Sequence, residues 1–385
     1  MSFYLAFKEL WRNRGRFFLV SLVIALITVL VLFVSALAEG LATANKEYIE
    51  KLDADLIVFQ ESAELSTTAS RIGRSTLNDI RRVDGVVAAG PIGFSSAAIV
   101  LGDGDELDIA LVGVEPGQPG EIPALRGRGL RSRRAQEAVI DSRVALRANL
   151  NVGDEFVIRS VQGTEDKFYT LRVVGVSDGR QYFFQPSVVV PYLTWNKIKP
   201  QTVITSNAAQ PELVSNVVGV RIADPARLAE MAQRIEAAVR DTQAVDRKTA
   251  YEASPGYSAQ QSTLMTQRAF AMLIGTLVIG GFFQIQILQK VAQIGVLKAI
   301  GASNRTIAVA SVAQITAVTA IGVAIGAAGT LGLSLSFPPT IPILFTQSSL
   351  IMAIASLMLI GPLGGMVSVL YSLRVEPLTA LGLSS

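Results

Sequence analysis

Three long runs without a charged residue constrain the fold of this chain more than any other feature. They extend from Phe17 to Ala38, from Ala269 to Gln289, and through 306–373. About 20 apolar residues in a helix cross the roughly 30 Å hydrocarbon core of a bilayer. Prolines in 336–342 divide the last run in two, because proline ends a helix. The sequence therefore predicts four transmembrane helices, at 17–39, 268–289, 306–335 and 347–373.

A cleavable signal peptide is the alternative for the first run, since Ala36-Leu37-Ala38 resembles a cleavage site. The apolar core of a signal peptide has about 7–15 residues, and this run is longer. An uncleaved membrane anchor is therefore favoured.

Basic residues indicate the orientation. Arginines precede the first span, Lys and Arg flank and occupy 290–305, Arg374 follows the fourth span, and the turn at 336–346 has neither. Because cytoplasmic loops carry the excess of Lys and Arg, both termini are predicted to be cytoplasmic. Residues 1–16 place Phe3, Phe7 and Trp11 on one face of an interfacial helix, with a frayed basic leader as the alternative. The tail at 374–385 is also predicted to be cytoplasmic.

Residues 40–267 are predicted to form an extracytoplasmic α/β domain inserted between the first two spans. Eight short segments between 54 and 222 have the composition of strands, and 70–83, 142–149 and 225–242 that of helices. Strands dominate about 120–200, so we expect a β-rich subdomain there. It interrupts an α/β part that begins near 45 and resumes near 210.

Two charged clusters in this domain have alternative interpretations. Arginines at 126, 128, 131, 133 and 134 favour a solvated loop, and the alternative is a site for anionic headgroups or a polar cargo. The acidic segment 102–108 lacks the later ligands of an EF-hand loop, so a hairpin turn is predicted.

The segment 290–305 is predicted to be a short cytoplasmic helix that another protein grips. Ile294 and Leu297 recur at helical spacing, with Gln293 and Lys298 on the opposite face. Gly301 stands where a helix would end, and Ser303 can cap the next one.

Several function classes are excluded by what the sequence lacks. It has no Cys and no His, which excludes disulfides, hydrolytic triads and most zinc chemistry. Its net charge of only +3 gives no case for nucleic acid. It has no GxxxxGK(S/T) phosphate-binding loop, and the spans carry no charged relay. A membrane enzyme is disfavoured, since no catalytic constellation stands out. The chain is therefore expected to be a non-catalytic permease subunit driven by a separate ATPase.

This order of parts resembles the FtsX-like/MacB permeases of ABC transporters over essentially the whole chain. IGVLKAIGA at 294–302 is similar to that family's cytoplasmic helix, which docks in a groove of the ATPase. The resemblance implies a permease homodimer in the bacterial plasma (inner) membrane, two ATPase subunits that hold ATP and Mg²⁺, and no permanently bound cofactor. It implies that the ATPase-coupling residues are Gln293, Ile294, Gly295, Leu297, Lys298 and Gly301. Gln293 stands where many members carry Glu.

Four further stretches, 3–10, 40–59, 254–260 and 288–301, resemble the haem-efflux (HrtB-like) branch of that family. This resemblance implies export of haem captured from within the bilayer. Without His or Cys, carboxylate, phenolate or thioether groups would hold the iron. Candidates near the outer ends of the first two spans are Glu39, Tyr48, Tyr257 and Met265. The alternative is that Glu39 is an interfacial charge and the tyrosines form an aromatic belt.

A mechanotransmitting subunit, similar to the FtsX and LolC proteins, is the alternative to an exporter. In this case ATP-driven motion of the outer domain would act on a cell-wall hydrolase, a lipoprotein or a peptide, and would require an outer partner protein.

Overall fold

The computed structural model describes residues 14–102, 104–200, 213–254, 257–289, 291–337 and 343–373. The chain divides into two compact units, a helical unit formed by Met1–Leu41 with Gln261–Ser385, and an α/β unit formed by Ala42–Gln260. Apart from 14–16, the predicted interfacial helix lies outside the described residues, and so does the predicted tail at 374–385.

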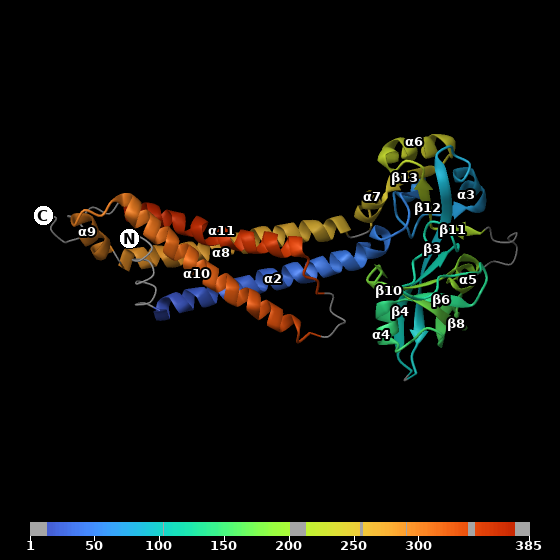
Figure 1. Ribbon diagram of the computed structural model, residues 1–385, viewed down its shortest axis with the longest axis horizontal. Coiled ribbons are helices and arrows are strands. Elements are labelled where there is room, and N and C mark those ends of the chain that lie inside the picture. The colour runs from blue at the N-terminus through green and yellow to red at the C-terminus, as the bar shows by residue number, and fades with distance from the viewer. Residues whose placement is uncertain are drawn as a thin grey trace. The chain divides into compact units, whose positions relative to one another are not determined.

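Four long helices build the helical unit and lie side by side in Figure 1. They are α2 (Arg14–Glu50), α8 (Tyr257–Gln289), α10 (Asn304–Ser334) and α11 (Gln347–Leu373). The segments long and apolar enough to cross a membrane are Phe17–Ala44, Ala259–Gln289, Asn304–Ser334 and Ser349–Met366. A shared core that includes Ile24, Ile279, Val318 and Ile360 joins all four helices. The prediction of four apolar helices is confirmed.

Helix α2 continues to Glu50, well past the end at 39 that we predicted from hydropathy. Its last turns lie in the α/β unit, where Tyr48 and Ile49 are buried in the core. Residues four apart form ion pairs there, Lys46 with Glu50 at 3.5 Å and Lys51 with Glu47 at 2.8 Å. The apolar run therefore ends before the helix does, because burial of 48 and 49 holds the helical conformation beyond the span.

Glycines of α10 allow a close approach to a neighbouring helix. A Cβ added at Gly322 would lie 2.6 Å from the Cβ of Ile24, and one at Gly326 would lie 2.5 Å from the Cβ of Thr28. Helices α2 and α10 thus contact each other through backbone. A Cβ at Gly332, by contrast, would meet nothing within 4 Å.

Replacement of Gly326 by Leu is expected to destabilise the helical unit by about 1–3 kcal/mol, the usual cost of overpacking. The Cβ of the added side chain would lie only 2.6 Å from the carbonyl oxygen of Ala25. Thermal unfolding of the full chain in detergent measures the loss. Gly332→Leu is the matched control and should unfold like the unmodified protein. Equal midpoints for the two variants would contradict helix contact at Gly326.

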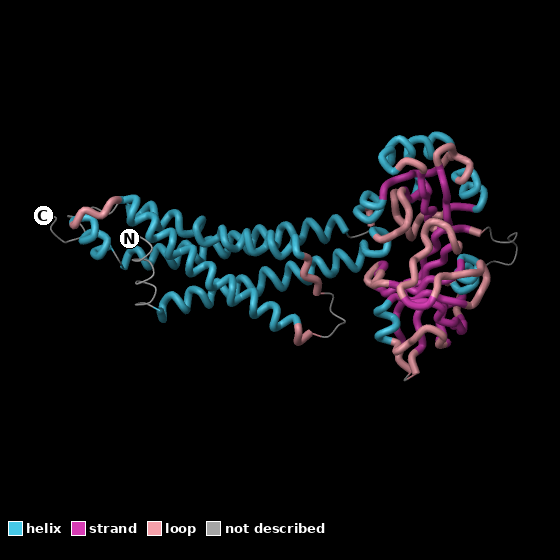
Figure 2. The backbone as a smooth tube through the Cα atoms, in the orientation of Figure 1, coloured by secondary structure: helices cyan, strands magenta, loops and turns pink. Residues whose placement is uncertain are grey.

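An eleven-stranded mixed sheet forms the centre of the α/β unit (Figure 2). Its main strand order is β13-β1-β12-β3-β4-β10-β6-β8-β5, with β7 paired to β3 and β8, and β9 paired to β10. The strands of this sheet are β1 (Leu56–Gln60), β3 (Val86–Val100), β4 (Glu106–Val114), β5 (Arg126–Gly127), β6 (Glu137–Asp141), β7 (Glu155–Gln162), β8 (Glu165–Ser177), β9 (Gln181–Tyr182), β10 (Gln185–Pro191), β12 (Val217–Ile222) and β13 (Thr242–Asp246). A separate two-stranded sheet joins β2 (Ile72–Gly73) to β11 (Val214–Ser215).

The α/β unit also contains seven short helices in its described part. They are the 3-10 helices η1 (Glu61–Ala63) and η2 (Pro225–Arg227) and the α-helices α3 (Arg74–Ile80), α4 (Ser142–Arg147), α5 (Tyr192–Ile198), α6 (Leu228–Ala238) and α7 (Arg247–Glu252). The helix predicted at 225–242 is shorter than expected, since α6 ends at Ala238. Residues 242–246 form β13 and pair with β1. Helix α5 packs on β3 and β4 through Trp195, whose ring occupies the space above Gly93 and Gly113.

Residues of about 120–200, where we predicted a β-rich subdomain, contain β5 to β10, and these strands belong to the same sheet as the rest of the α/β unit. Strand β3 pairs with β12 along its first half and with β4 along its second half, and the two pairings meet at Ile92. One long strand therefore joins both halves into a single sheet. The predicted hairpin turn at 102–108 is confirmed, since Leu101 donates its N–H to the carbonyl of Asp105 at 2.9 Å between β3 and β4.

Candidate functional site

Helix α9 (Val291–Ala299) connects α8 and α10 and ends where the glycine predicted. Gly301 has a φ of +100° and donates its N–H to the carbonyl of Lys298 at 3.0 Å, while Ala302 donates to that of Leu297 at 2.9 Å. This pair of bonds is the Schellman motif, which needs a left-handed residue. Ser303 Oγ then accepts the N–H of Thr306 at 3.2 Å and caps α10. The predicted ends of the two helices are confirmed.

The apolar residues of α9 form a buried set and an exposed set. Ile294 is 8% exposed and packs against Ile287 of α8 and Ile307 of α10. The α9 apolar face consists of Val296, Leu297 and Ile300, which are 42%, 40% and 79% exposed. The helix is therefore held on the bundle through Ile294 and exposes these other apolar side chains.

The six predicted coupling residues do not share one surface. Gln293 and Leu297 are exposed, and Gly301 is exposed at the turn, whereas Ile294 and Gly295 are buried and Lys298 is half-buried. Ile294 and Gly295 thus position α9, because that side faces α8 and α10. Val296 and Ile300 are also exposed and were not among the predicted residues. Their signal in the sequence was their spacing of four, which puts both on the side of the helix away from Ile294.

The four predicted cargo residues are divided between the two units. Glu39 of α2 is half-buried, and Ser349 Oγ of α11 donates to its Oε2 at 3.0 Å. Met265 of α8 is 77% exposed. In the α/β unit, Tyr257 is half-buried and contacts the ring of Tyr251 at 5.8 Å between centroids.

Tyr48 lies inside the core of the α/β unit rather than at the surface position that we predicted. Its ring makes edge contacts with Phe94 and Tyr182, at centroid distances of 5.5 and 6.2 Å. Burial raises the pKa of its phenol far above the usual range. Because the side chain is fully buried, it anchors the end of α2 and does not contact a cargo in the membrane.

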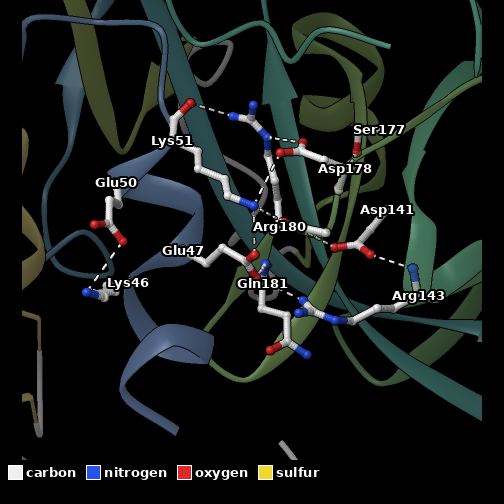
Figure 3. Close-up of polar contacts among 11 residues, drawn as sticks. Lys46, Glu47, Glu50, Lys51, Asp141, Arg143, Ser177, Asp178, Arg180 and Gln181 are labelled. Carbon is white, nitrogen blue, oxygen red and sulfur yellow. Dashed lines mark hydrogen bonds and ion pairs between the residues drawn. The ribbon is translucent and has the colours of Figure 1, made fainter. Parts of the chain in front are cut away.

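A cluster of charges, the Glu47 network, surrounds the end of α2 within the α/β unit (Figure 3). The Glu47 carboxylate is buried and accepts hydrogen bonds from Lys51 Nζ at 2.8 Å, Arg143 Nη1 at 2.9 Å and the Gln181 N–H at 3.2 Å. Lys51 also pairs with Asp178 at 3.2 Å. These bonds join the last turns of α2 to α4 and to the segment between β8 and β9.

Asp141 is the second buried carboxylate in this cluster. It caps α4 by accepting the N–H of Arg143 at 2.6 Å, and its other oxygen accepts the N–H of Arg180. Burial raises the pKa of Asp141 to about 6, against the opposing effect of these bonds. Arg180 in turn donates from Nε to Asp178 at 2.8 Å. Sequence reasoning missed this network, because its partners are far apart in the chain and each has an unremarkable local sequence.

Comparison with known proteins connects this arrangement to a family. The MacB-like periplasmic core domain family matches residues 17–238, more than half of the chain, and the FtsX-like permease C-terminal family matches residues 268–377. This chain belongs to the MacB/FtsX permease family. Membership implies an ABC-type permease of the inner membrane, that is, a non-catalytic subunit that works with an ATPase partner.

Similar curated proteins span the same length as this MacB/FtsX permease. Those from Staphylococcus haemolyticus and Staphylococcus epidermidis, named for a hemin transport system permease, HrtB, are 23% and 24% identical over 98% of this chain and 99% of theirs. The crystallised extracellular domain of the ABC-type transporter YknZ is 14% identical, covers 50% of this chain and 99% of its own, and has a TM-score of 0.35. The periplasmic region of MacB from Actinobacillus actinomycetemcomitans is 15% identical over 52% of this chain and 92% of its own, with a TM-score of 0.35.

Proposed function

We propose that two copies of this permease and two ATPase subunits form an efflux system that exports haem, or another lipophilic cargo, from the membrane. The observation that carries the proposal is the α9 apolar face, which lies exposed on a short helix between two spans. Exposed apolar surface of this kind is typical of a protein interface. The excess of basic residues around α9 supports a cytoplasmic position, where an ATPase is available.

Haem is favoured as the cargo by the full-length similarity to hemin transport permeases. Glu39 is the proposed ligand of the haem iron, since the sequence offers no His or Cys. The hydrogen bond from Ser349 orients the Glu39 carboxylate, as hydrogen bonds from neighbouring residues usually orient the ligands of a metal. Met265 of the same helical unit is proposed as a further contact, whereas Tyr48 is not, because of its burial.

Glu39→Ala is expected to change the Soret band of haem bound to the complex purified with its ATPase, and to remove haem stimulation of ATP hydrolysis. Ser349→Ala should weaken haem binding by about tenfold, as is typical when the hydrogen-bond partner of a ligand is lost. Absorption spectra and ATPase assays with added haem measure both effects. A Soret band identical in Glu39→Ala and the unmodified protein would remove the haem assignment.

Mechanotransmission remains the second candidate, and the continuity of α2 favours it. One unbroken helix contains the first span and ends in the Glu47 network, so displacement of that span has a stiff route into the α/β unit. Crosslinking on intact cells, with and without an ATPase-inactive partner, tests it. An outer protein captured only during ATP turnover would favour this function over export.

A further inference from the structure

A pocket of about 580 Å³ in the α/β unit is not used by anything described above. Ligand sites for small molecules usually have volumes of about 300–1,000 Å³. Part of its wall is apolar and comes from β2, α3, α5 and the residue before β11, with Ile72, Leu77, Leu193 and Leu213 as its aliphatic side chains. Tyr192 and Pro91 continue this surface. The pocket thus has the size and the apolar wall of a site for a small ligand.

The rest of the wall is strongly basic. Arg74, Arg81, Arg133 and Arg134 line the pocket together with one carboxylate, Glu115. Glu115 is buried, and its two oxygens are paired with Arg81 at 2.7 Å and with Arg133 at 2.5 Å. Within the described part of the chain, no ion pair engages Arg74 or Arg134. The pocket therefore keeps an excess of positive charge beside its apolar wall.

We propose that this pocket binds an amphipathic carboxylate, with the apolar body on the leucine side and the carboxylate on Arg74 and Arg134, the arginines of the wall that are not paired with Glu115. Guanidinium groups suit this role because their planar forks pair with carboxylate oxygens through two hydrogen bonds. Arg134, one of the arginines that we had assigned to a solvated loop, thereby gains a role. A porphyrin with its carboxylates has this chemistry, and so has a long-chain fatty acid. The choice of a porphyrin as first probe rests on the proposed function.

Metal-free protoporphyrin IX is the most specific probe of this pocket, because it contains no iron that Glu39 could coordinate. In full-length Trp11→Phe the one remaining tryptophan is Trp195, one turn from Tyr192 on α5. Porphyrin in the pocket should quench Trp195 fluorescence with saturation, and a long-chain fatty acid that shares the pocket should reverse the quenching. Arg74→Gln/Arg134→Gln should weaken porphyrin binding about tenfold, the usual effect of losing a charge-assisted hydrogen bond.

Asn78→Glu adds a carboxylate at an exposed pocket position on α3 and removes no arginine, so it should weaken binding without affecting folding. Arg126→Gln/Arg131→Gln is the matched control, because it removes the same amount of charge from arginines outside the pocket wall, in the run that contains Arg134. Equal weakening in control and pocket variants would overturn the proposal, and so would quenching without saturation. Reversal by the fatty acid assigns a lipid carboxylate, and lack of reversal assigns a tetrapyrrole. Failure here would leave haem-stimulated ATP hydrolysis unchanged, so the proposed function is tested separately.

Discussion

Leu297→Asp is expected to abolish stable binding of the ATPase while the permease still inserts in the membrane. Leu297 belongs to the α9 apolar face, and a carboxylate buried there against a partner would lose its hydration without a compensating bond. A cost of several kcal/mol corresponds to at least about a hundredfold loss of affinity. Co-purification and stimulation of ATP hydrolysis measure the loss.

Two further variants test whether the α9 apolar face is responsible. Ile300→Asp should have the same effect, since Ile300 is the most exposed residue of this face. Leu297→Met keeps an apolar side chain of similar volume and should bind the ATPase almost normally. A complex of Leu297→Asp that survives purification with full ATP hydrolysis would show that the ATPase docks elsewhere.

Glu47→Ala should destabilise the α/β unit by about 3 kcal/mol. Removing one partner of a buried ion pair costs about 3–5 kcal/mol, and the lower end applies because Lys51 and Arg143 are partly exposed. The change also leaves the N–H of Gln181 without its carboxylate. Denaturant unfolding of the full chain, monitored by tryptophan fluorescence, measures the effect.

Glu50→Ala is the control for that experiment, because Glu50 lies three residues after Glu47 on α2 and its exposed carboxylate pairs with the half-buried Lys46 at 3.5 Å. Exposed pairs of this kind contribute about 0–1 kcal/mol, so little change is expected. If the Glu47 network carries motion from α2, Glu47→Ala should also lower export more than ATP hydrolysis. The same unfolding midpoint for both variants would show that the network does not stabilise the unit.

The spans and the helix ends of the helical unit could be predicted because they depend on local properties of the sequence. Bilayer thickness sets how long an uncharged run must be, so the spans were visible in the sequence. Only a glycine adopts the left-handed conformation at low cost, so Gly301 indicated the end of α9. The contact of Gly322 and Gly326 with another helix was predictable from their spacing, but α2 as the partner was not.

Errors occurred where distant residues decide the outcome. Tyr48 looked like an aromatic residue at a membrane boundary, and only its contacts with Phe94 and Tyr182 show that it belongs to a core. Likewise, no local signal shows that β3 pairs with β12 and β4 along its two halves, which places the β-rich part in the same sheet as the rest of the unit.

By itself, the sequence determined the four apolar helices, the large α/β insertion and the place of the short helix at 291–299, because hydropathy and backbone preference act over a few residues. Only the tertiary structure decided which side of α9 is exposed, which charges surround Glu47, and how Arg133 and Arg134 come to line a pocket with Leu77. These features depend on side chains that are far apart in the chain and meet only after folding.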